Sequence, residues 1–319
     1  MNIIALDTET TGVLWKDVPF AVSMWGKDIP PWEKNYYDWR DGRHYEREDA
    51  IRYIKFYIRE GYEFVFHNAK FDLRMLGKIG LDFSDNVIHD THCLAHLLDE
   101  HQDKKLKSLA RTHLGVTTDE EEVLKVVRRE LKVKKEDGYS PIPRDVVEPY
   151  AIKDAEFTHD LFFKFFPIVK ANPDLYQLYQ DEMELTRVLM QIEDAGIGVN
   201  QEYVHDMLAS LGSDVMRLTN EAVAMMRTPS NLEPNPNSTP QIMAYFDAHG
   251  IELDNVQKAT LAQVDHPLAA IIVELREKKK LRETYFKNIK HETVDGVLHP
   301  NFRQHGTVTG RMSSGSESA

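Results

Sequence analysis

The chain has 319 residues, of which 42% are hydrophobic and 29% are charged, and its formal net charge is -13. These values are typical of a globular protein of about two domains, and the negative charge argues against non-specific binding of nucleic acid or anionic membranes by the whole surface. The single cysteine, Cys93, excludes an intrachain disulfide and a cysteine-rich metal site. No segment resembles a signal peptide or reaches the ~20 apolar residues of a membrane span, so we expect a cytoplasmic protein without a membrane partner.

Two acids follow the first predicted strand. The apolar run 3–6 predicts a strand that is buried on both faces at the centre of a sheet. Side chains alternate along a strand, so Asp7 and Glu9 point to the same side. A buried pair of carboxylates is tolerated when a cation lies between them, and carboxylate oxygens suit Mg²⁺ or Mn²⁺. Alternatively, the strand ends in solvent and both acids are hydrated.

The rest of the first half predicts a sheet flanked by helices. Strands are expected at residues 21–25, 36–39 and 64–66, and helices at residues 46–60, 90–98, 106–114 and from residue 145. This alternation is typical of an α/β domain. A charge-dense stretch indicates either a solvated helix face or an edge that contacts phosphates: Lys125, Arg128, Arg129, Lys132, Lys134 and Lys135.

Further polar residues lie on two predicted helices, one that begins at Asn68 and the long one from residue 145. Asn68 is placed to cap a helix, which puts Asp72 in the first turn. By itself, Asp72 suits a surface acid that complements the helix N-terminus. Tyr150 and Asp154 are four residues apart on the long helix and share one face, which by itself predicts only a hydrogen bond between phenol and carboxylate.

The pattern becomes nearly all helical beyond Pro167 and Pro173, where we expect a domain boundary. A basic helix at residues 268–290 either remains solvated or binds a phosphate backbone. The glycine-rich stretch 306–314 is either a tail or a loop that binds a backbone. An apolar stripe of the kind that faces a core follows the boundary: Leu178, Leu185, Val188, Leu189 and Ile192.

The four acids and the tyrosine of the first half form the set that a two-metal phosphodiesterase needs. In such enzymes two cations ~3.5–4 Å apart stabilise the attacking and leaving oxygens. Asp7 would bridge both ions. Glu9 and Asp154 would complete the site that activates the water, and Asp72 would hold the other ion, directly or through water, near the leaving 3′ oxygen. Tyr150 would orient the water by a hydrogen bond.

The order and spacing of these segments resemble the three exonuclease motifs of the DEDD superfamily. Asp7-Thr-Glu9-Thr-Thr-Gly is similar to the first motif, Asn68-Ala-Lys-Phe-Asp72 to the second, and Tyr150-x-x-x-Asp154 to the third in its tyrosine form. The resemblance implies an RNase H-like exonuclease domain, with a mixed sheet flanked by helices, over residues 1–172. It also implies a 3′→5′ exodeoxyribonuclease that uses two divalent metal ions, Mg²⁺ or Mn²⁺.

Further segments are similar to family A DNA polymerases, in particular to phage-type members. His89-Asp90-Thr91 resembles part of their proofreading domain, and Asn235-Pro-Asn-Ser238 resembles part of their thumb. Residues 307–314 resemble the loop that grips the primer–template. The resemblance implies a mostly α-helical, thumb-like domain with the beginning of the palm over residues 173–319. It also implies DNA contacts by Thr10, Asn68, Lys280, Lys287, Thr309 and Arg311.

The last residues depart from the family pattern. After Ser314 the sequence continues as Gly315-Ser316-Glu317-Ser318-Ala319, where the family continues into palm and fingers. We therefore expect no polymerase activity from this chain alone, and a second chain carrying the palm and fingers is the expected partner, a truncated polymerase being the alternative. The resemblance implies the cytoplasm of a bacterium or of a phage-infected host.

The main prediction is a proofreading exonuclease that shortens single-stranded 3′ ends of DNA. Two alternatives stay open. The basic helix and the 307–311 loop would also suit a DNA-gripping assembly subunit with little nuclease activity of its own. A related exoribonuclease is the other alternative, and the thumb-like half argues against it.

Overall fold

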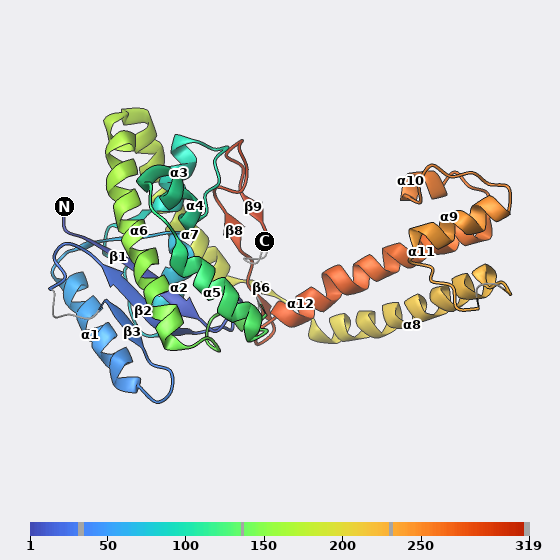
Figure 1. Cartoon of the computed structure of the whole chain (residues 1–319), viewed down its shortest axis with the longest axis horizontal. Helices are drawn as coiled ribbons and strands as arrows, with labels where there is room; N and C mark the ends of the chain where they lie inside the picture. Colours follow the sequence, from blue (N-terminus) through green and yellow to red (C-terminus); the bar gives the residue numbers. More distant parts are fainter. Residues whose placement is uncertain (31–34, 135–136, 230–231, 316–319) are drawn as a thin grey trace. The chain divides into compact units, whose positions relative to one another are not determined.

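A computed structural model describes residues 1–30, 35–134, 137–229 and 232–315 (Figure 1). Of the residues discussed above, Lys135 and residues 316–319 lie outside these ranges. The chain forms two compact units, one of Met1–Gly196 with His299–Ala319 and one of Ile197–Leu298. No helix within the described ranges is long and apolar enough to cross a membrane.

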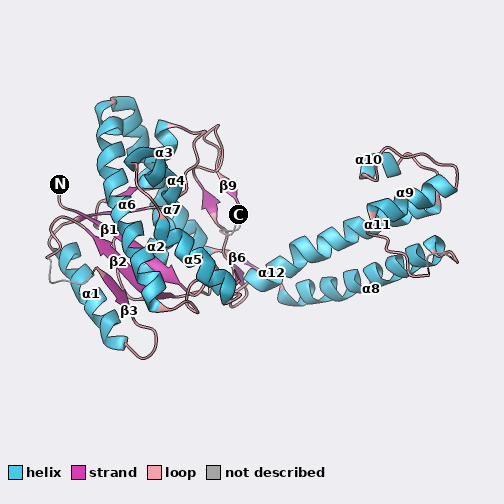
Figure 2. Ribbon diagram, in the orientation of Figure 1, coloured by secondary structure: helices cyan, strands magenta, loops and turns pink. Residues whose placement is uncertain are grey.

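The first unit is built on a five-stranded mixed sheet of order β3-β2-β1-β4-β5 (Figure 2). The central strand pairs antiparallel with β2 and parallel with β4, while β3 and β5 form the edges. This confirms the expected mixed sheet with the first strand at its centre. The strands are β1 (Ile3–Thr10), β2 (Pro19–Trp25), β3 (Tyr36–Asp38), β4 (Glu63–Phe66) and β5 (Ile88–Asp90).

Helices cover both faces of the sheet, so β1 is buried on both sides as expected. Ile4 and Leu6 lie in one core with α1 and α2, whereas Ile3 and Ala5 lie in the opposite core with α3, α6 and α7. The helices are α1 (His44–Arg59), α2 (Ala69–Lys78), α3 (Thr91–Leu98), α4 (Leu106–Leu109), the π-helix η1 (Ala110–Leu114), α5 (Asp119–Glu130), α6 (Arg144–Ala171) and α7 (Pro173–Ala195).

The expected cap of α2 by Asn68 is wrong. Asn68 has a left-handed backbone, with φ of 73°, and its side chain makes no capping hydrogen bond. Instead, the Asp90 carboxylate accepts hydrogen bonds from the amides of Asn68 (3.0 Å) and Ala69 (2.8 Å). It also caps its own helix α3 through the amide of His92 at 2.8 Å. One acid serves both helices because the parallel strands β4 and β5 end side by side.

The compact units divide the chain elsewhere than near residue 172. Helix α6 runs through Pro167, and α7 packs Tyr179 into the core of the first unit, so this unit continues to Gly196. The predicted stripe of α7 is also only partly inward, because Leu178, Val188 and Ile192 are exposed. The short strands β8 (Phe302–Arg303) and β9 (Ser313–Ser314) return the chain to this unit.

The second unit is mostly helical, as expected. Its two ends meet where β6 (Ile197–Gly198) pairs with β7 (Val297–Leu298). Ala222, Phe246 and Ile272 belong to its apolar core. The helices are α8 (Gln201–Met226), α9 (Thr239–Ala248), α10 (Lys258–Leu261), α11 (Pro267–Lys280), the π-helix η3 (Leu281–Phe286) and α12 (Lys287–Glu292).

Candidate active site

Strand β1 directs Asp7 and Glu9 toward α6. Alternation along the strand places both acids on the same face as Ile3 and Ala5, which pack against that helix. Glu9 is buried, with 5% of its surface exposed. The pairing with β2 shifts register between Glu9 and Thr10, at the end of the strand that carries the acids. The two carboxylates are therefore held by the sheet rather than hydrated at a free strand end.

Helix α6 brings Tyr150 and Asp154 to the same face. The Ser23 hydroxyl donates a hydrogen bond of 2.8 Å to the Ala151 carbonyl, and Ser23 pairs with Asp7 across the sheet. Ala151 is fully buried, and its small side chain lets the helix approach the strands. Since Tyr150 and Asp154 flank this contact one turn apart, they are fixed beside the acids of β1.

Asp72 reaches the site from α2 on the other side of β1. Its Oδ1 accepts hydrogen bonds from the backbone amide of Thr8 (2.9 Å) and from the Thr8 hydroxyl (2.7 Å). The parallel ladder with β4 covers only Ile3 to Ala5, so at Thr8 a side chain replaces the neighbouring strand. Asp72 is buried, with 3% exposed, which contradicts its interpretation as a surface acid.

A cavity of about 250 Å³ opens between β1 and α6. Asp7, Glu9, Tyr150 and Asp154 all line it, together with Thr10. Its apolar and cationic walls come from Val13, Phe71, Tyr139 and Arg128. Arg128 belongs to the charge-dense stretch that the sequence left open between a solvated helix face and an edge that contacts phosphates. Its side chain lies in the wall of the acid cavity and not on an outer, solvated helix face.

The 138–143 loop closes one side of the cavity, next to the end of β1. Gly138 has a left-handed φ of 57°, and a Cβ atom at this position would lie 2.2 Å from the Thr10 carbonyl oxygen. The Tyr139 amide donates a hydrogen bond to the same oxygen at 3.4 Å. Only glycine permits this approach of the loop to the end of β1.

The acids of the site perturb one another. Burial raises the pKa of Asp7 well above its usual range, and the charges of Asp72, Asp154 and Glu9 add to the rise. Burial likewise raises the pKa of Glu9, again with contributions from Asp154 and Asp72. Burial raises the pKa of Asp154 to about 6, although Lys107 opposes this. The charged forms of these acids therefore need a compensating positive charge.

Lys107, on α4, is a cation that contacts the acids of the site directly. Its Nζ lies 2.5 Å from Oδ1 of Asp154 and 2.8 Å from Oε1 of Glu120. Burial lowers the pKa of Lys107, but Asp154 and Glu120 raise it by more, so the net shift of the pKa is upward. No sequence signal identified Lys107, because its role depends on how α4 packs against α5 and α6.

The donor set of the cavity fits hard divalent cations. Mutually repelling carboxylates in a buried cavity supply the oxygen ligands that Mg²⁺ and Mn²⁺ prefer. Within the described ranges, no three or more His, Cys, Asp or Glu side chains are arranged as a complete metal-binding group. Substrate oxygens and water would have to supply further ligands, as is usual for Mg²⁺.

The residues expected to contact DNA are spread over the chain. Thr10 lines the acid cavity, and its hydroxyl donates to the Gly12 carbonyl at 2.6 Å. Asn68 instead lines a different pocket, of about 290 Å³, with His92, His305 and residues 301–303. Thr309 and Arg311 are exposed on the loop between β8 and β9.

Lys280 and Lys287 belong to the second unit, whereas the acids of the cavity belong to the first. Lys280 is exposed, whereas Lys287 forms an ion pair with Glu283. Other basic side chains of this helix contact their own unit: Lys278 pairs with Asp214 at 3.0 Å, and Lys279 bonds to Asn237 at 2.7 Å. At these positions the basic helix is therefore solvated and paired within its own unit, which is one of the two interpretations that the sequence left open.

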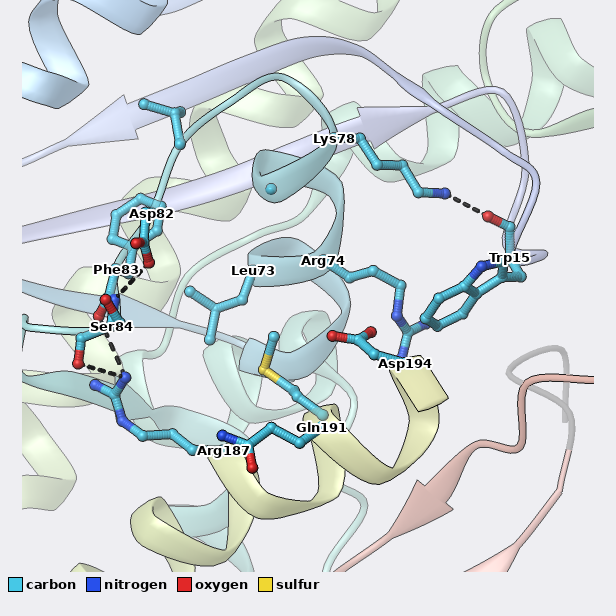
Figure 3. A pocket seen from close by; sticks show the side chains of 13 residues that line it. Trp15, Leu73, Arg74, Lys78, Asp82, Phe83, Ser84, Arg187, Gln191 and Asp194 are labelled. Atoms are coloured by element: carbon cyan, nitrogen blue, oxygen red, sulfur yellow. Dashed lines mark hydrogen bonds between the residues drawn. The ribbon is translucent and has the colours of Figure 1, made fainter. Parts of the chain in front are cut away.

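A larger pocket, of about 450 Å³, lies between α2 and α7 (Figure 3). The basic side chains that line it contact other groups of the same chain. Arg187 donates to the carbonyls of Phe83 (3.3 Å) and Ser84 (2.9 Å), Lys78 bonds to the carbonyl of Trp15, and the Arg74 guanidinium lies 4.6 Å from the Trp15 ring. This pocket contains none of the five predicted catalytic residues, so the smaller, acid-lined cavity is the candidate active site.

Comparisons with known proteins find two family matches along the chain. Residues 1–170 match the 3'-5' exonuclease family, and residues 201–317 match DNA polymerase family A. The DNA polymerase of Escherichia phage T5 is 31% identical over 297 residues, which cover 84% of this chain and 35% of that protein. DNA polymerase DpoZ of Salmonella phage PMBT28 is 26% identical over 339 residues, which cover 98% of this chain and 52% of that protein.

A solved structure shares the fold. The POL domain of Pol1 from M. smegmatis, in complex with DNA primer-template and dNTP, superposes with a TM-score of 0.68 at 18% identity. The match covers 98% of this chain and 51% of that one. The chain thus spans about half, or less, of the length of the proteins that it resembles.

The mixed sheet, the acid-lined cavity and the match over residues 1–170 define a 3′–5′ exonuclease domain. The second match and the phage and bacterial relatives narrow the assignment. The chain belongs to the family A DNA polymerases.

Proposed function

We propose that the chain removes nucleotides from single-stranded 3′ ends of DNA by metal-dependent phosphodiester hydrolysis. The observation that carries the proposal is the cavity in which Asp7, Glu9, Tyr150 and Asp154 meet. Asp72 accepts a hydrogen bond from the Thr8 amide, between Asp7 and Glu9 on the strand. In the reaction, water attacks the terminal phosphorus and the P–O3′ bond breaks. The products are a 5′-mononucleotide and a DNA strand with a new 3′ hydroxyl.

The chain's own residues have distinct tasks in this proposal. Asp7, Glu9, Asp72 and Asp154 would hold two divalent ions, Mg²⁺ or Mn²⁺. When bound, such ions ease deprotonation of the attacking water and stabilise charge on the leaving oxygen. Tyr150 holds the water by a hydrogen bond. The apolar and aromatic walls of the cavity, Val13, Phe71 and Tyr139, suit stacking of an unpaired terminal base.

The direct test follows Mg²⁺-dependent shortening of a 5′-labelled single strand. Asp7→Ala should reduce the rate by at least about 10³-fold, because it removes one of the carboxylates that would hold the metal ions. Replacing Asp206, an exposed acid of α8, by alanine is the matched control and should leave the rate unchanged. Undiminished activity of Asp7→Ala would contradict the proposal. Comparing deoxyribo- and ribo-oligonucleotides tests the exoribonuclease alternative.

DNA gripping by the second unit is the other candidate function. It is supported by the match of residues 201–317 to DNA polymerase family A and by the exposed Lys280. Lys280→Glu should weaken binding of a primer–template in a gel-shift titration, with a smaller salt dependence, because a phosphate contact is lost. A second chain that carries palm and fingers stays a prediction, and copurification with a candidate polymerase chain would test it.

A further inference from the structure

Lys107 is an unusual residue for the interior of an active site. It belongs to the short helix α4, and only 6% of its surface is exposed. A buried ammonium group is unfavourable unless charged or polar partners surround it. A lysine at this place beside the acid cavity therefore indicates a task that an apolar side chain of similar size would not perform.

The contacts of Lys107 join three helices around the ammonium group. Oδ1 of Asp154, on α6, lies at 2.5 Å and Oε1 of Glu120, on α5, at 2.8 Å. The ring centroids of Tyr150 and Phe157 lie 4.5 Å and 4.9 Å from Nζ, within the range of cation–π attraction. The same ammonium group thus touches both residues that α6 contributes to the candidate site.

Glu120 sets the net charge of the cluster in which Lys107 contacts Asp154. With two carboxylates around one ammonium group, the local cluster keeps a net negative charge, so Lys107 does not neutralise the site. Glu120 and Lys107 are 14% and 8% exposed at their side chains, which limits their freedom to exchange partners with water. The pair therefore acts as a fixed support behind one oxygen of Asp154 and behind one face of the Tyr150 ring.

We propose that Lys107 is a positioning residue of the exonuclease reaction, which sets the orientation of the Asp154 carboxylate and of the Tyr150 ring. This inference rests on the proposed function. It assigns no contact with DNA or with the attacking water to Lys107. Because reaction rates depend steeply on sub-ångström placement of the groups around the reacting atoms, a support of this kind affects turnover more than substrate binding.

Two replacements of Lys107 and one control lysine test the role. Lys107→Met keeps the aliphatic stem and removes the charge, while Lys107→Arg keeps the charge. Lys153→Met is the matched control, because Lys153 precedes Asp154 on α6 but is 45% exposed and pairs with Glu156 at the surface. The full chain is assayed for steady-state hydrolysis of a single-stranded oligonucleotide. In the absence of DNA, Mn²⁺ binding is measured by electron paramagnetic resonance, and folding by urea denaturation.

The expected result separates positioning from simple structural support. Lys107→Met should lower kcat by about 10²-fold and leave KM within about threefold. It should bind Mn²⁺ at least as tightly as the unaltered protein, because removal of a nearby positive charge strengthens the attraction between carboxylates and cation. Lys107→Arg should recover about tenfold of the lost kcat, since a planar guanidinium replaces the charge but not the geometry. Lys153→Met should match the unaltered protein.

Several outcomes would overturn the inference. Undiminished kcat of Lys107→Met is one, and equal impairment of Lys107→Arg and Lys107→Met is another. Parallel losses of Mn²⁺ affinity, stability and kcat would indicate a structural role only. If Lys107→Met does not fold, Glu120→Gln carries the test, with kcat expected to fall about tenfold at unchanged KM. Inactivity of the unaltered protein would instead contradict the proposed function, so the two failures are distinguishable.

Discussion

The hydroxyl of Ser23 on β2 donates a hydrogen bond of 2.8 Å to the backbone carbonyl of Ala151 on α6. Both residues are fully buried. This bond joins the sheet to the helix at the level of the acid cavity, because Ser23 pairs with Asp7 and Ala151 follows Tyr150. The Ser23 side chain therefore adds a hydrogen bond to the packing that holds the helix and strand parts of the candidate site together.

Ser23→Ala should reduce the free energy of unfolding by about 1–3 kcal/mol, because the Ala151 carbonyl would lose a partner in a buried position. Exonuclease activity should fall as α6 gains freedom next to β1. Ser213→Ala is the control, since the Ser213 hydroxyl donates to the Ala209 carbonyl at an exposed position on α8. Urea denaturation of the two variants provides the comparison, and equal stabilities would contradict the stabilising role of Ser23.

Asp90 supports two helix N-termini with one carboxylate, so its loss should be felt at both. Asp90→Ala is expected to cost about 2–4 kcal/mol of unfolding free energy, roughly twice the usual value of one capping residue. Asp99→Ala is a suitable control, because Asp99 accepts a single exposed bond from the His101 amide. Chemical denaturation measures the difference. A cost no larger than that of one cap would show that the amides of Asn68 and Ala69 find other partners.

Alanine at Gly138 should cost more stability and activity than alanine at another glycine with a left-handed backbone. Any residue with a Cβ at the left-handed backbone of Gly138 costs about 1–2 kcal/mol, and here the Cβ would also meet the Thr10 carbonyl. Gly80 is the matched control, since it has φ of +83° and open space around the position of a Cβ. Thermal unfolding and exonuclease rate of both alanine variants should show a larger loss for Gly138. Equal losses would mean that the 138–143 loop yields without disturbing β1.

The fold should lose stability in mild acid through His305. The ring of this residue lies against the ring of His92, with centroids 3.6 Å apart and planes tilted by 47°, and burial lowers the pKa of His305 to about 4 despite the opposing charge of Asp90. Between the unfolded value near 6.5 and about 4, the unfolded chain binds more protons than the folded chain. The stabilisation is therefore complete above about pH 6.5 and is lost as the pH falls toward 4.

His305→Gln should accordingly show a smaller decrease of unfolding free energy between pH 7.5 and 4.5 than the unaltered protein. Urea denaturation at pH steps across this range measures the slope. His101→Gln serves as the control, because the His101 side chain is 74% exposed. Identical slopes for all three proteins would show that the His305 contact does not depend on the imidazole being neutral.

Local pattern and chain order predicted much of this molecule. The burial of β1 on both faces and the common direction of Asp7 and Glu9 follow from residue alternation alone, and the spacing of Tyr150 and Asp154 follows from the helical repeat. Contacts between distant segments were the part that no local pattern contains. Lys107, Gly138 and the shared cap at Asp90 are of this kind, since each acts on residues from another element of the fold.

Helix α7 shows why an apolar stripe misled. The side that packs inward carries Thr186 and Glu193 together with Tyr179 and Leu189, and these polar groups are satisfied inside the unit. Glu193 is fully buried because it pairs with Lys70 and Arg74, the latter at 2.7 Å, and accepts from the Phe302 amide at 2.7 Å. A hydrophobic pattern does not predict the burial of a charged residue, because such burial depends on charged partners from other segments.

The bond between Asp72 and Thr8 changes how any mutation of Asp72 must be interpreted. Oδ1 of Asp72 takes the place of a neighbouring strand for the Thr8 amide, between the two acids of β1. Alanine at this position would remove a proposed metal ligand and loosen the strand that carries two others, so the measured loss would exceed the part due to chemistry. Asparagine keeps a carbonyl oxygen for the strand while discarding the negative charge. The difference between the two variants would separate the share of Asp72 in building the site from its share in operating it.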